Sequence, residues 1–249
     1  MNNAKDSYAL WKKEEQASFS GWDFSYIRGR LKEENPPWDY NGEAKKLVKN
    51  ATAVLDMGTG GGEILSTLGP FPKHTIATEG WLPNVPVARK KLEPLGVKIV
   101  AVDESGKLPF KNDEFDLVLN RHSAFDRREV FRILQKDGIF FTQQVSGNNL
   151  QDLIEEFRGD TQSKDKNAEI EKRRLEKVGF RVEIAKEWKG KAEFKDVGAI
   201  VYFLKAIPWV VKDFSVDVYL PILQKLQKKA DSGKKLVFKE TRFLIRARK

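Results

Sequence analysis

The amino-acid sequence predicts an α/β fold built on a mostly parallel β-sheet. From residue 51 onward, short apolar runs alternate with amphipathic stretches, as they do where parallel strands are joined by crossover helices. The chain has 249 residues, of which 40% are hydrophobic and 33% are charged, and this composition is typical of globular proteins that bury a core. A glycine-rich segment directly follows the first apolar run, at a position where parallel sheets bind ligands.

Residues 1–50 are charged and aromatic, and we expect them to form a helical N-terminal cap. The core then begins with a buried strand at 53–57, which is followed by glycines and a helix at 64–68. A second strand at 75–78 and a helix at 85–92 repeat this unit. Two strand–helix units in one rhythm indicate neighbouring strands that run parallel.

The same rhythm continues with three further strands. We expect a third strand at 97–102, which Asp103 closes, and a fourth at 115–120. A helix at 127–134 and a fifth strand at 138–145 follow, separated by a glycine-containing turn. Five strands in regular order strengthen the prediction of a parallel sheet.

The pattern changes after residue 147. Helices are expected at 149–157 and 168–178, a sixth strand at 180–188 and a final strand at 242–248. The expected organisation is a helical N-terminal cap at 1–50, a core at 51–189, a helical insertion that serves as a substrate lid at 190–235, and the last strand of the core at 236–249.

The composition excludes several kinds of site. The chain has no cysteine and only two histidines, His74 and His122, so we expect no disulfide and no metal site. The longest apolar run, 198–211, contains Lys205 and Pro208 and is shorter than the roughly 20 residues of a membrane span. The N-terminus lacks the apolar stretch of a secretory signal, so we expect a cytoplasmic protein that does not cross a membrane.

The positive charge is concentrated near the C-terminus. The formal net charge is +9, and residues 205–249 contain twelve Lys or Arg against four Asp or Glu. Lys225, Lys228 and Lys229 fall on the polar side of an amphipathic helical pattern. Such a surface is either a solvated helix face or a surface that contacts nucleic-acid phosphates. The sequence leaves both interpretations open.

The strongest local signal is the segment 56–63, Asp-Met-Gly-Thr-Gly-Gly-Gly-Glu, between an apolar strand and a helical pattern. Glycines there allow positive φ and close approach of a ligand to the backbone, and the start of a helix offers free N–H groups. A dinucleotide fingerprint requires a third glycine where this sequence has Glu63, and a carboxylate suits a pyrophosphate poorly. It is better suited to a ligand that carries a sulfonium and no phosphate.

The spacing of Asp56, Gly58, Gly60 and Gly62 resembles the first motif of class I S-adenosylmethionine-dependent methyltransferases. The resemblance covers about residues 50–145 and is nearest to the broad UbiE-like group, whose members act on small molecules, lipids or RNA. It implies a Rossmann-like, seven-stranded, mostly parallel sheet with an antiparallel last strand. It also implies that the protein transfers methyl groups and that S-adenosylmethionine is its cofactor.

The resemblance places the cofactor along the ends of three strands. The glycine-rich loop would hold the methionine part, Glu79 the ribose hydroxyls, and Asp103 or its neighbour Glu104 the adenine. Each carboxylate could instead cap a turn, but their joint spacing after successive strands favours binding. The residues that we expect to contact the cofactor are Asp56, Gly58, Thr59, Gly60, Gly61, Gly62, Glu79, Gly80, Asp103, Glu104, Asn120 and Trp38.

His122 lies just past the fourth strand, where acceptors of this family approach the sulfonium, and it is a candidate general base. A hydrogen-bonded structural role is the alternative. Asn120 could contact either the cofactor or the acceptor. The segment around them departs from the N-P-P-[FY] or D-P-P-[FY] signature of amino-nitrogen methyltransferases, which disfavours that chemistry. Methyl transfer from a sulfonium can proceed by positioning and desolvation alone, so a strong base is not required.

Aromatic residues outside the core could roof the site, with the segment Trp38-Asp39-Tyr40 as the candidate lid beside the cofactor. They are Trp22, Phe24, Tyr26, Trp38 and Tyr40 before the core, and Tyr202, Trp209 and Tyr219 in the insertion. An enclosed pocket and the lack of a recognisable RNA-binding module favour a small-molecule acceptor. The alternatives are an RNA methyltransferase that uses the basic C-terminal surface, an NAD-type oxidoreductase, and a non-catalytic S-adenosylmethionine-binding protein.

Overall fold

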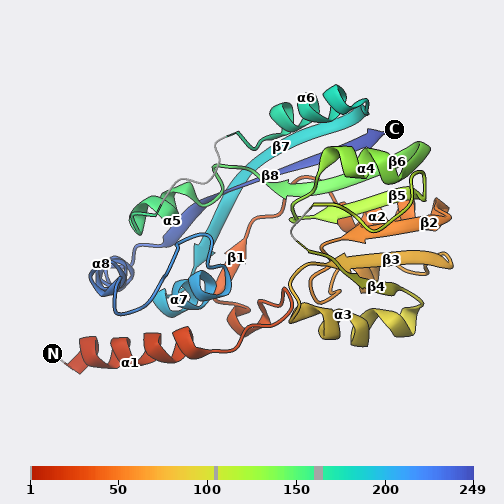
Figure 1. The fold of residues 1–249 in the computed structure, drawn as a ribbon. Coiled ribbons are helices and arrows are strands. Elements are labelled where there is room, and N and C mark those ends of the chain that lie inside the picture. Colours follow the sequence, from red (N-terminus) through yellow and green to blue (C-terminus); the bar gives the residue numbers. More distant parts are fainter. Residues whose placement is uncertain (1, 104–105, 160–164) are drawn as a thin grey trace.

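The computed structural model describes residues 2–103, 106–159 and 165–249, and these contain one mixed β-sheet (Figure 1). Its strands are β1 (Leu31–Glu33), β2 (Ala53–Met57), β3 (His74–Glu79), β4 (Lys98–Ala101), β5 (Phe115–Arg121), β6 (Leu134–Val145), β7 (Arg181–Phe194) and β8 (Leu236–Arg248). They are ordered β1-β7-β8-β6-β5-β2-β3-β4. The five strands from β6 to β4 are parallel, and β8 runs antiparallel to both β6 and β7. The predicted parallel α/β fold with an antiparallel last strand is confirmed.

The sheet differs from the prediction at its antiparallel edge. It has an eighth strand, β1, which pairs with the far end of β7, where Leu31 lies opposite Phe194. Strands β7 and β8 are also longer than predicted, because β7 continues past residue 188 and β8 begins before residue 242. Their extra residues pair with each other, and the exposed edge of β7 then accepts the short β1. A three-residue strand carries too little periodic signal to be recognised in a sequence.

Helices cover both faces of the parallel part of the sheet. The helices are α1 (Asn2–Gln16), α2 (Tyr40–Asn50), α3 (Asn84–Leu92), α4 (Arg127–Ile133), α5 (Gln151–Glu156), α6 (Ala168–Val178), α7 (Val197–Ala206) and α8 (Leu220–Asp231). Helices α2 and α3 pack on one face and α4 and α6 on the other. Side-chain caps define several helix starts: Asp39 accepts from the Gly42 amide at the start of α2, and Asp126 accepts from the amides of Arg128 and Glu129 at the start of α4.

The helix predicted at 64–68 is a single 3₁₀ turn, η2 (Leu65–Thr67). Pro70 and Pro72 follow within five residues, and proline cannot donate the backbone hydrogen bonds that would continue a helix. The loop that precedes η2 is therefore not followed by a full α-helix. Two further 3₁₀ turns, η1 (Ser25–Ile27) and η3 (Glu93–Leu95), lie in connections.

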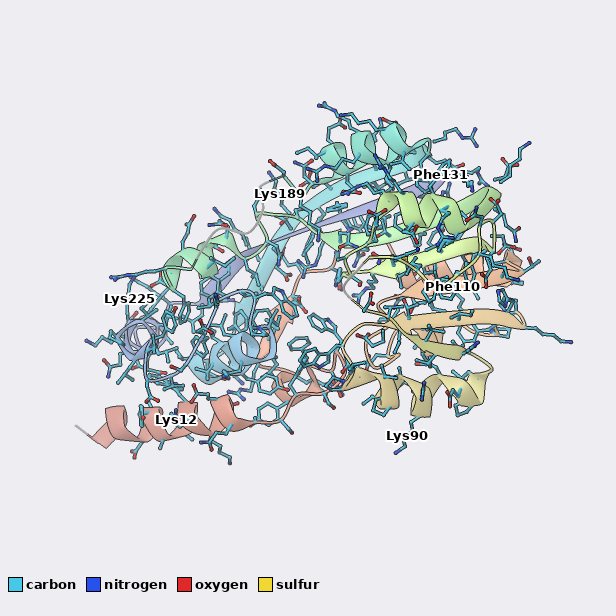
Figure 2. The ribbon with its side chains drawn as sticks, in the orientation of Figure 1. Lys12, Lys90, Phe110, Phe131, Lys189 and Lys225 are labelled. Carbon is cyan, nitrogen blue, oxygen red and sulfur yellow. The ribbon has the colours of Figure 1, made fainter. Side chains whose placement is uncertain are left out.

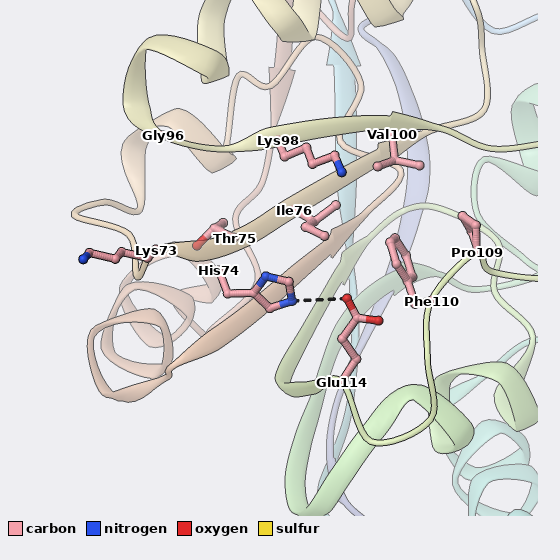
Figure 3. A pocket seen from close by; sticks show the side chains of 10 residues that line it. All are labelled: Lys73, His74, Thr75, Ile76, Gly96, Lys98, Val100, Pro109, Phe110 and Glu114. Carbon is pink, nitrogen blue, oxygen red and sulfur yellow. Dashed lines mark hydrogen bonds and ion pairs between the residues drawn. The ribbon is translucent and has the colours of Figure 1, made fainter.

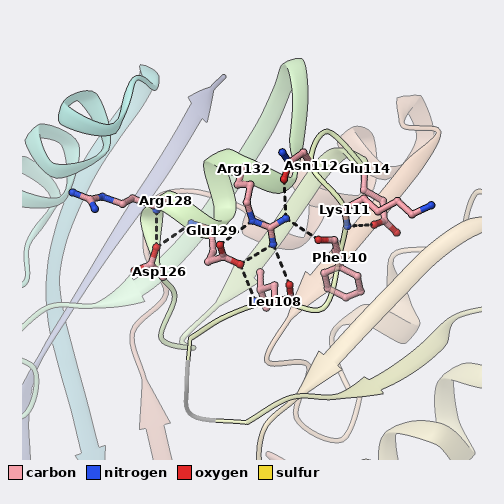
Figure 4. A network of polar contacts seen from close by, with 9 residues as sticks. All are labelled: Leu108, Phe110, Lys111, Asn112, Glu114, Asp126, Arg128, Glu129 and Arg132. Atoms are coloured by element: carbon pink, nitrogen blue, oxygen red, sulfur yellow. Dashed lines mark hydrogen bonds and ion pairs between the residues drawn. The ribbon is translucent and has the colours of Figure 1, made fainter.

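The connection between β4 and β5 contains no helix in its described residues, 102–103 and 106–114. Side chains of α4 hold this connection instead (Figure 4). Arg132 donates to the carbonyl oxygens of Leu108 at 3.0 Å and Phe110 at 2.7 Å, and Glu129 accepts from the Leu108 amide at 2.9 Å. A pocket of about 430 Å³ opens near the amino ends of β3 and β4, where His74 contacts Glu114 at 3.2 Å (Figure 3). That edge lies opposite the glycine-rich loop.

A second hydrophobic core lies beyond the parallel strands, around the far halves of β7 and β8 (Figure 1). Helices α1, α5, α7 and α8 surround it, and we call these four helices the helical lobe. Helix α7 is its centre, because nine of its ten residues are buried. In the described part of the chain, no helix is both long enough and apolar enough to cross a membrane.

Candidate functional site

The glycine-rich loop lies at the carboxyl end of β2, in the middle of the parallel strands. The Thr59 amide donates to the Thr78 carbonyl oxygen at 2.9 Å, which ties the loop to β3. Gly58 and Gly60 have φ values of 67° and 63°, which favour glycine. At Gly58 a β-carbon would also clash with the side chain of Ser123, which follows β5. The loop is therefore packed closely between two strand ends.

Glu79 ends β3 and holds the loop through both carboxylate oxygens. Its Oε2 accepts from the Gly60 amide at 2.6 Å, and its Oε1 accepts from the Trp81 amide at 2.7 Å. The residue is only 7% exposed, and burial raises the pKa of its carboxyl group although these amide hydrogen bonds lower it. Each carboxylate oxygen can accept a further hydrogen bond, so the group can still bind hydroxyls of a ligand.

Asp56 adds a second buried carboxyl group beside the loop. Burial raises its pKa to about 6, and the negative charge of Glu79 contributes to the increase. Two carboxyl groups next to the same loop repel an anionic ligand and favour a cationic one. This chemistry fits a sulfonium and an ammonium group, and it does not fit a pyrophosphate.

The N-terminal linker between α1 and α2 crosses the loop. The Gly21 amide donates to Asn84 Oδ1 at 3.1 Å, and a β-carbon on Gly60 would lie 3.5 Å from the Cβ atom of Trp22. The Trp22 ring stacks on Trp209, with ring centroids 5.9 Å apart and an angle of 8° between the planes. Trp209 belongs to the connection that follows α7. The N-terminal linker therefore walls the loop, and the connection that follows α7 packs against this linker.

His122 and Gln143 lie side by side at the carboxyl ends of β5 and β6. Trp38 Nε1 donates to Gln143 Oε1 at 2.7 Å, and because an indole can only donate, this contact fixes the orientation of the Gln143 amide. Its NH₂ group then faces His122 Nε2 at 3.2 Å. The imidazole therefore accepts at Nε2 and carries its proton on Nδ1.

The surroundings of His122 make it a weak base. Burial lowers its pKa well below the ordinary value, and the positive charges of Arg121, Arg242 and Lys166 lower it further. Its Nε2 lone pair is also occupied by the Gln143 amide. The residue stays neutral at physiological pH, and these features support a positioning role more than proton removal from an acceptor.

Residues 55–142 match the family model described as "Methyltransferase domain". The matched range contains the glycine-rich loop, Glu79 and His122. The chain carries an S-adenosylmethionine-dependent methyltransferase domain. S-adenosylmethionine is accordingly the cofactor of this domain, and the two carboxyl groups beside the loop fit its positive charge. No curated protein sequence matches the chain.

Solved structures share the fold of the methyltransferase domain and much of the rest of the chain. The YcgJ protein from Bacillus subtilis is 18% identical, with a TM-score of 0.59, and the match covers 84% of this chain and 97% of that one. An S-adenosylmethionine-dependent methyltransferase from Mesorhizobium loti is 14% identical, with a TM-score of 0.50 and coverage of 85% and 98%. The [4+2]-cyclase SpnF is 16% identical, with a TM-score of 0.51 and coverage of 83% and 80%. At these identities the likeness concerns the fold.

The structure brings most of the predicted cofactor residues of the methyltransferase domain to one edge of the sheet. Asp56, Glu79 and the loop from Gly58 to Gly62, including Thr59 and Gly61, lie together at the ends of β2 and β3. Gly80 adjoins the end of β4, because a β-carbon there would lie 3.7 Å from the Val102 carbonyl oxygen. Asp103 is exposed and follows β4 by two residues. Glu104 lies outside the described residues.

Asn120 and Trp38 are placed differently from the loop residues. Asn120 is fully buried, and its side-chain oxygen accepts from Thr142 Oγ1 at 2.9 Å, while its side-chain amide faces the Met57 carbonyl oxygen at 3.5 Å. It thereby joins β5 to β6 and β2. Trp38 is bound to Gln143 at the end of β6, nearer the acceptor side of the methyltransferase domain. A role for either residue in cofactor binding stays a prediction.

Several residues at this edge were not predicted. Arg121 and Ser123 directly flank His122, so their position at the end of β5 was a usable signal. Gln143 and Gln144 lie on the predicted fifth strand, but polar residues in a strand do not announce which neighbour they contact. Lys166 comes from a distant connection that follows α5, and no local pattern points to it.

Proposed function

We propose that this protein transfers a methyl group from S-adenosylmethionine to a small-molecule acceptor at the carboxyl ends of β5 and β6. In the proposed arrangement, the loop from Gly58 to Gly62 holds the methionine part, Glu79 the ribose, and Asp103 or its neighbour Glu104 the adenine. The observation that carries the proposal is the pairing of Glu79 with the Gly60 amide at 2.6 Å, which puts a buried carboxylate at the end of a strand directly beside the glycine-rich loop.

The residues of this chain would promote the reaction by position and by exclusion of water. Bound S-adenosylmethionine supplies a methyl group whose bond to sulfur breaks with the electron pair left on sulfur, while the acceptor atom donates the pair for the new bond and releases any proton to water. Trp22 and Trp209 would shield the loop from solvent, which strengthens electrostatic interactions inside the site. His122, as a neutral and hydrogen-bonded imidazole, would orient groups without removing a proton.

The charge distribution supports a small acceptor over RNA. Many C-terminal cations are already paired with acidic side chains: Lys225 with Glu156 at 2.6 Å, Lys235 with Glu193 at 3.0 Å, Arg246 with Glu43 at 3.0 Å, Arg248 with Glu183 at 2.8 Å and Lys249 with Asp113 at 2.7 Å. Lys225 and Lys189 lie on different parts of the molecule (Figure 2). Ion pairing of these cations reduces the contacts that they can offer to a phosphate backbone.

Transfer of labelled methyl groups from S-adenosylmethionine into a cell extract tests the proposal. We expect label in small organic products, with no change after ribonuclease treatment. Label in large, ribonuclease-sensitive material would show that the acceptor is RNA and not a small molecule. Binding of the cofactor without any transfer would contradict the proposal and favour a binding protein or another reaction, since SpnF, a cyclase by name, shares this fold.

A further inference from the structure

A cavity of about 200 Å³ opens beside the glycine-rich loop, on the sheet face that α4 and α6 cover. Its lining includes Ser123, Phe125, Gln144, Lys166, Arg174 and Phe243. Ser123 connects the cavity to the loop, because its side chain occupies the space where a β-carbon of Gly58 would lie. The cavity therefore adjoins the place where the methyl group would be delivered.

The charges in this lining do not cancel. Arg127 and Glu171 also line the cavity and bind each other, with Arg127 Nε 2.7 Å from Glu171 Oε1. Glu171 is 3% exposed, so its charge is neutralised within that pair. In the described residues, Lys166 and Arg174 have no carboxylate within ion-pair distance, and Arg174 donates only to the Asp165 carbonyl oxygen at 3.2 Å. The lining thus keeps an excess of positive charge.

Lys166 is partly buried, and its positive charge affects His122 at the end of β5. Burial lowers the pKa of its ammonium group, and its charge helps to lower the pKa of His122 at the end of β5. The negative charge of Glu171, which is already paired with Arg127, offsets this effect only in part. A partly buried cation without a direct ion pair is unfavourable, and a cofactor sulfonium nearby would add a further positive charge. An anion bound in the cavity would offset both the cost of burying Lys166 and its repulsion with the sulfonium.

Two other features define the rest of the ligand. Phe125, Phe243 and Ala124 give the cavity an apolar wall, which suits a carbon skeleton. Gln144 is 1% exposed, and its Oε1 atom accepts no hydrogen bond from the described residues, while its amide donates to the Ser123 carbonyl oxygen at 3.0 Å. This oxygen is buried, so a hydroxyl or amine of a ligand could donate to it after a small rotation of the Gln144 side chain toward the cavity. A volume of about 200 Å³ lies below the roughly 300–1,000 Å³ of pockets for drug-sized ligands, which favours a small molecule.

We infer that this cavity binds the methyl acceptor, and that the acceptor is a small organic anion whose charged group lies against Lys166 and Arg174. This inference rests on the proposed methyl transfer to a small molecule. Gln144 would contact the hydroxyl or amine that receives the methyl group, and the aromatic wall would hold the carbon skeleton. Recognition would then require both a negative charge and a short apolar body.

A binding experiment tests the cavity without turnover. Acetate, malonate and benzoate are titrated by calorimetry into the wild type, Lys166→Gln and Lys177→Gln, with the matching amides as neutral probes. Lys177 lies on α6 and is exposed, so its variant controls for the loss of one positive charge. We expect at least one of the acids to bind the wild type and Lys177→Gln equally and Lys166→Gln about tenfold more weakly, and the amides not to bind. Equal affinity in all three proteins, equal binding of amides, or no binding of any acid would overturn the inference.

A turnover experiment separates this inference from the proposed function. Small molecules of a cell extract are divided by anion exchange before the assay, and each fraction is offered with labelled S-adenosylmethionine. We expect label only with the retained, anionic fraction, and about tenfold less with Lys166→Gln than with Lys177→Gln. Label only with the unretained fraction would overturn the inference and leave the proposed function intact. Label on RNA alone, or no label with any fraction, would overturn both.

Discussion

Asp56 and Glu79 bring two buried carboxyl groups to one glycine-rich loop. Burial is the main cause that raises the pKa of both groups, and it raises that of Asp56 to about 6. A cationic ligand stabilises the ionised form of a carboxyl group, so ligand binding and proton release are linked. The pH dependence of binding therefore reports on these two residues.

We expect the affinity for S-adenosylmethionine to fall as the pH is lowered from about 8 to about 5. Asp56 takes up a proton near its pKa of about 6 and then no longer attracts the sulfonium. Titration calorimetry across this range gives the dissociation constants. In Asp56→Asn the dependence should be weaker, since only Glu79 of the pair still titrates; an equally steep dependence would assign the titration to another group.

The same burial predicts that Asp56→Asn stabilises the ligand-free protein at neutral pH. A folded-state pKa raised from 3.8 to about 6 favours folding below the lower value, and this contribution is lost as the pH rises through the higher one. The ionised side chain then costs about 1–3 kcal/mol. Chemical denaturation should show the gain at about pH 7.5 and none at about pH 4. A gain of equal size at both pH values would attribute it to a cause other than ionisation.

Glu79→Ala should weaken S-adenosylmethionine binding by about 1–3 kcal/mol, because the ribose hydroxyls and the Gly60 and Trp81 amides would lose their acceptor. Dissociation constants measured by calorimetry check this. Glu93→Ala is the matched control, since it removes an exposed carboxylate that lies 3.8 Å from Arg89, away from the loop. If Glu79→Ala binds as the wild type does, Glu79 only holds the loop.

The backbone of the glycine-rich loop leaves room for a ligand, because its glycines carry no side chains. Gly60→Arg should abolish S-adenosylmethionine binding, because a long side chain would fill the space of the methionine part, and the φ of 63° would be strained. The fold should persist, since the nearest atoms to a β-carbon there are 3.5 Å away. Circular dichroism with a binding titration separates the two effects. An unchanged dissociation constant would show that the methionine part of the cofactor does not bind at this loop.

Elements with a strong local pattern were predictable, and elements that depend on tertiary contacts were not. The five parallel strands are short apolar runs. Asp56, the glycines and Glu79 lie in consecutive segments of the sequence, so their order was visible. The short β1 exists because β7 offers it an edge, and the loop is followed by a 3₁₀ turn in place of an α-helix because prolines come soon after it. Trp22 was expected only as one of several roofing aromatics, and its position on the loop depends on the docking of the linker.

Ion pairs of Arg30 contribute to the stability of the whole molecule. Arg30 binds Glu14 of α1 at 2.9 Å and Asp196, the cap of α7, at 2.9 Å. Both pairs join the start of β1 to the helical lobe. These side chains are only partly exposed, so the pairs are shielded from solvent more than ordinary surface pairs are.

Arg30→Ala should lower the free energy of unfolding by about 1–3 kcal/mol, because it leaves Glu14 and Asp196 without their cation. Chemical denaturation measures the change. Arg173→Ala removes an exposed pair with Glu169 at 3.0 Å and should cost less than about 0.5 kcal/mol. Equal losses in the two variants would show that Arg30 contributes no more than a surface pair.

Strands β7 and β8 run without interruption from the parallel sheet into the helical lobe, with Arg181 opposite Arg248 at one end and Phe194 opposite Leu236 at the other. Two continuous, paired strands resist bending, so they give the helical lobe no hinge about which it could rotate away from the parallel strands. We therefore expect cofactor and product to exchange through a smaller, local movement of the chain. The linker that carries Gly21 and Trp22 is held beside the loop by the Gly21 amide hydrogen bond to Asn84 of α3 and by the stacking of Trp22 on Trp209. A local movement of this linker would be enough to uncover the loop.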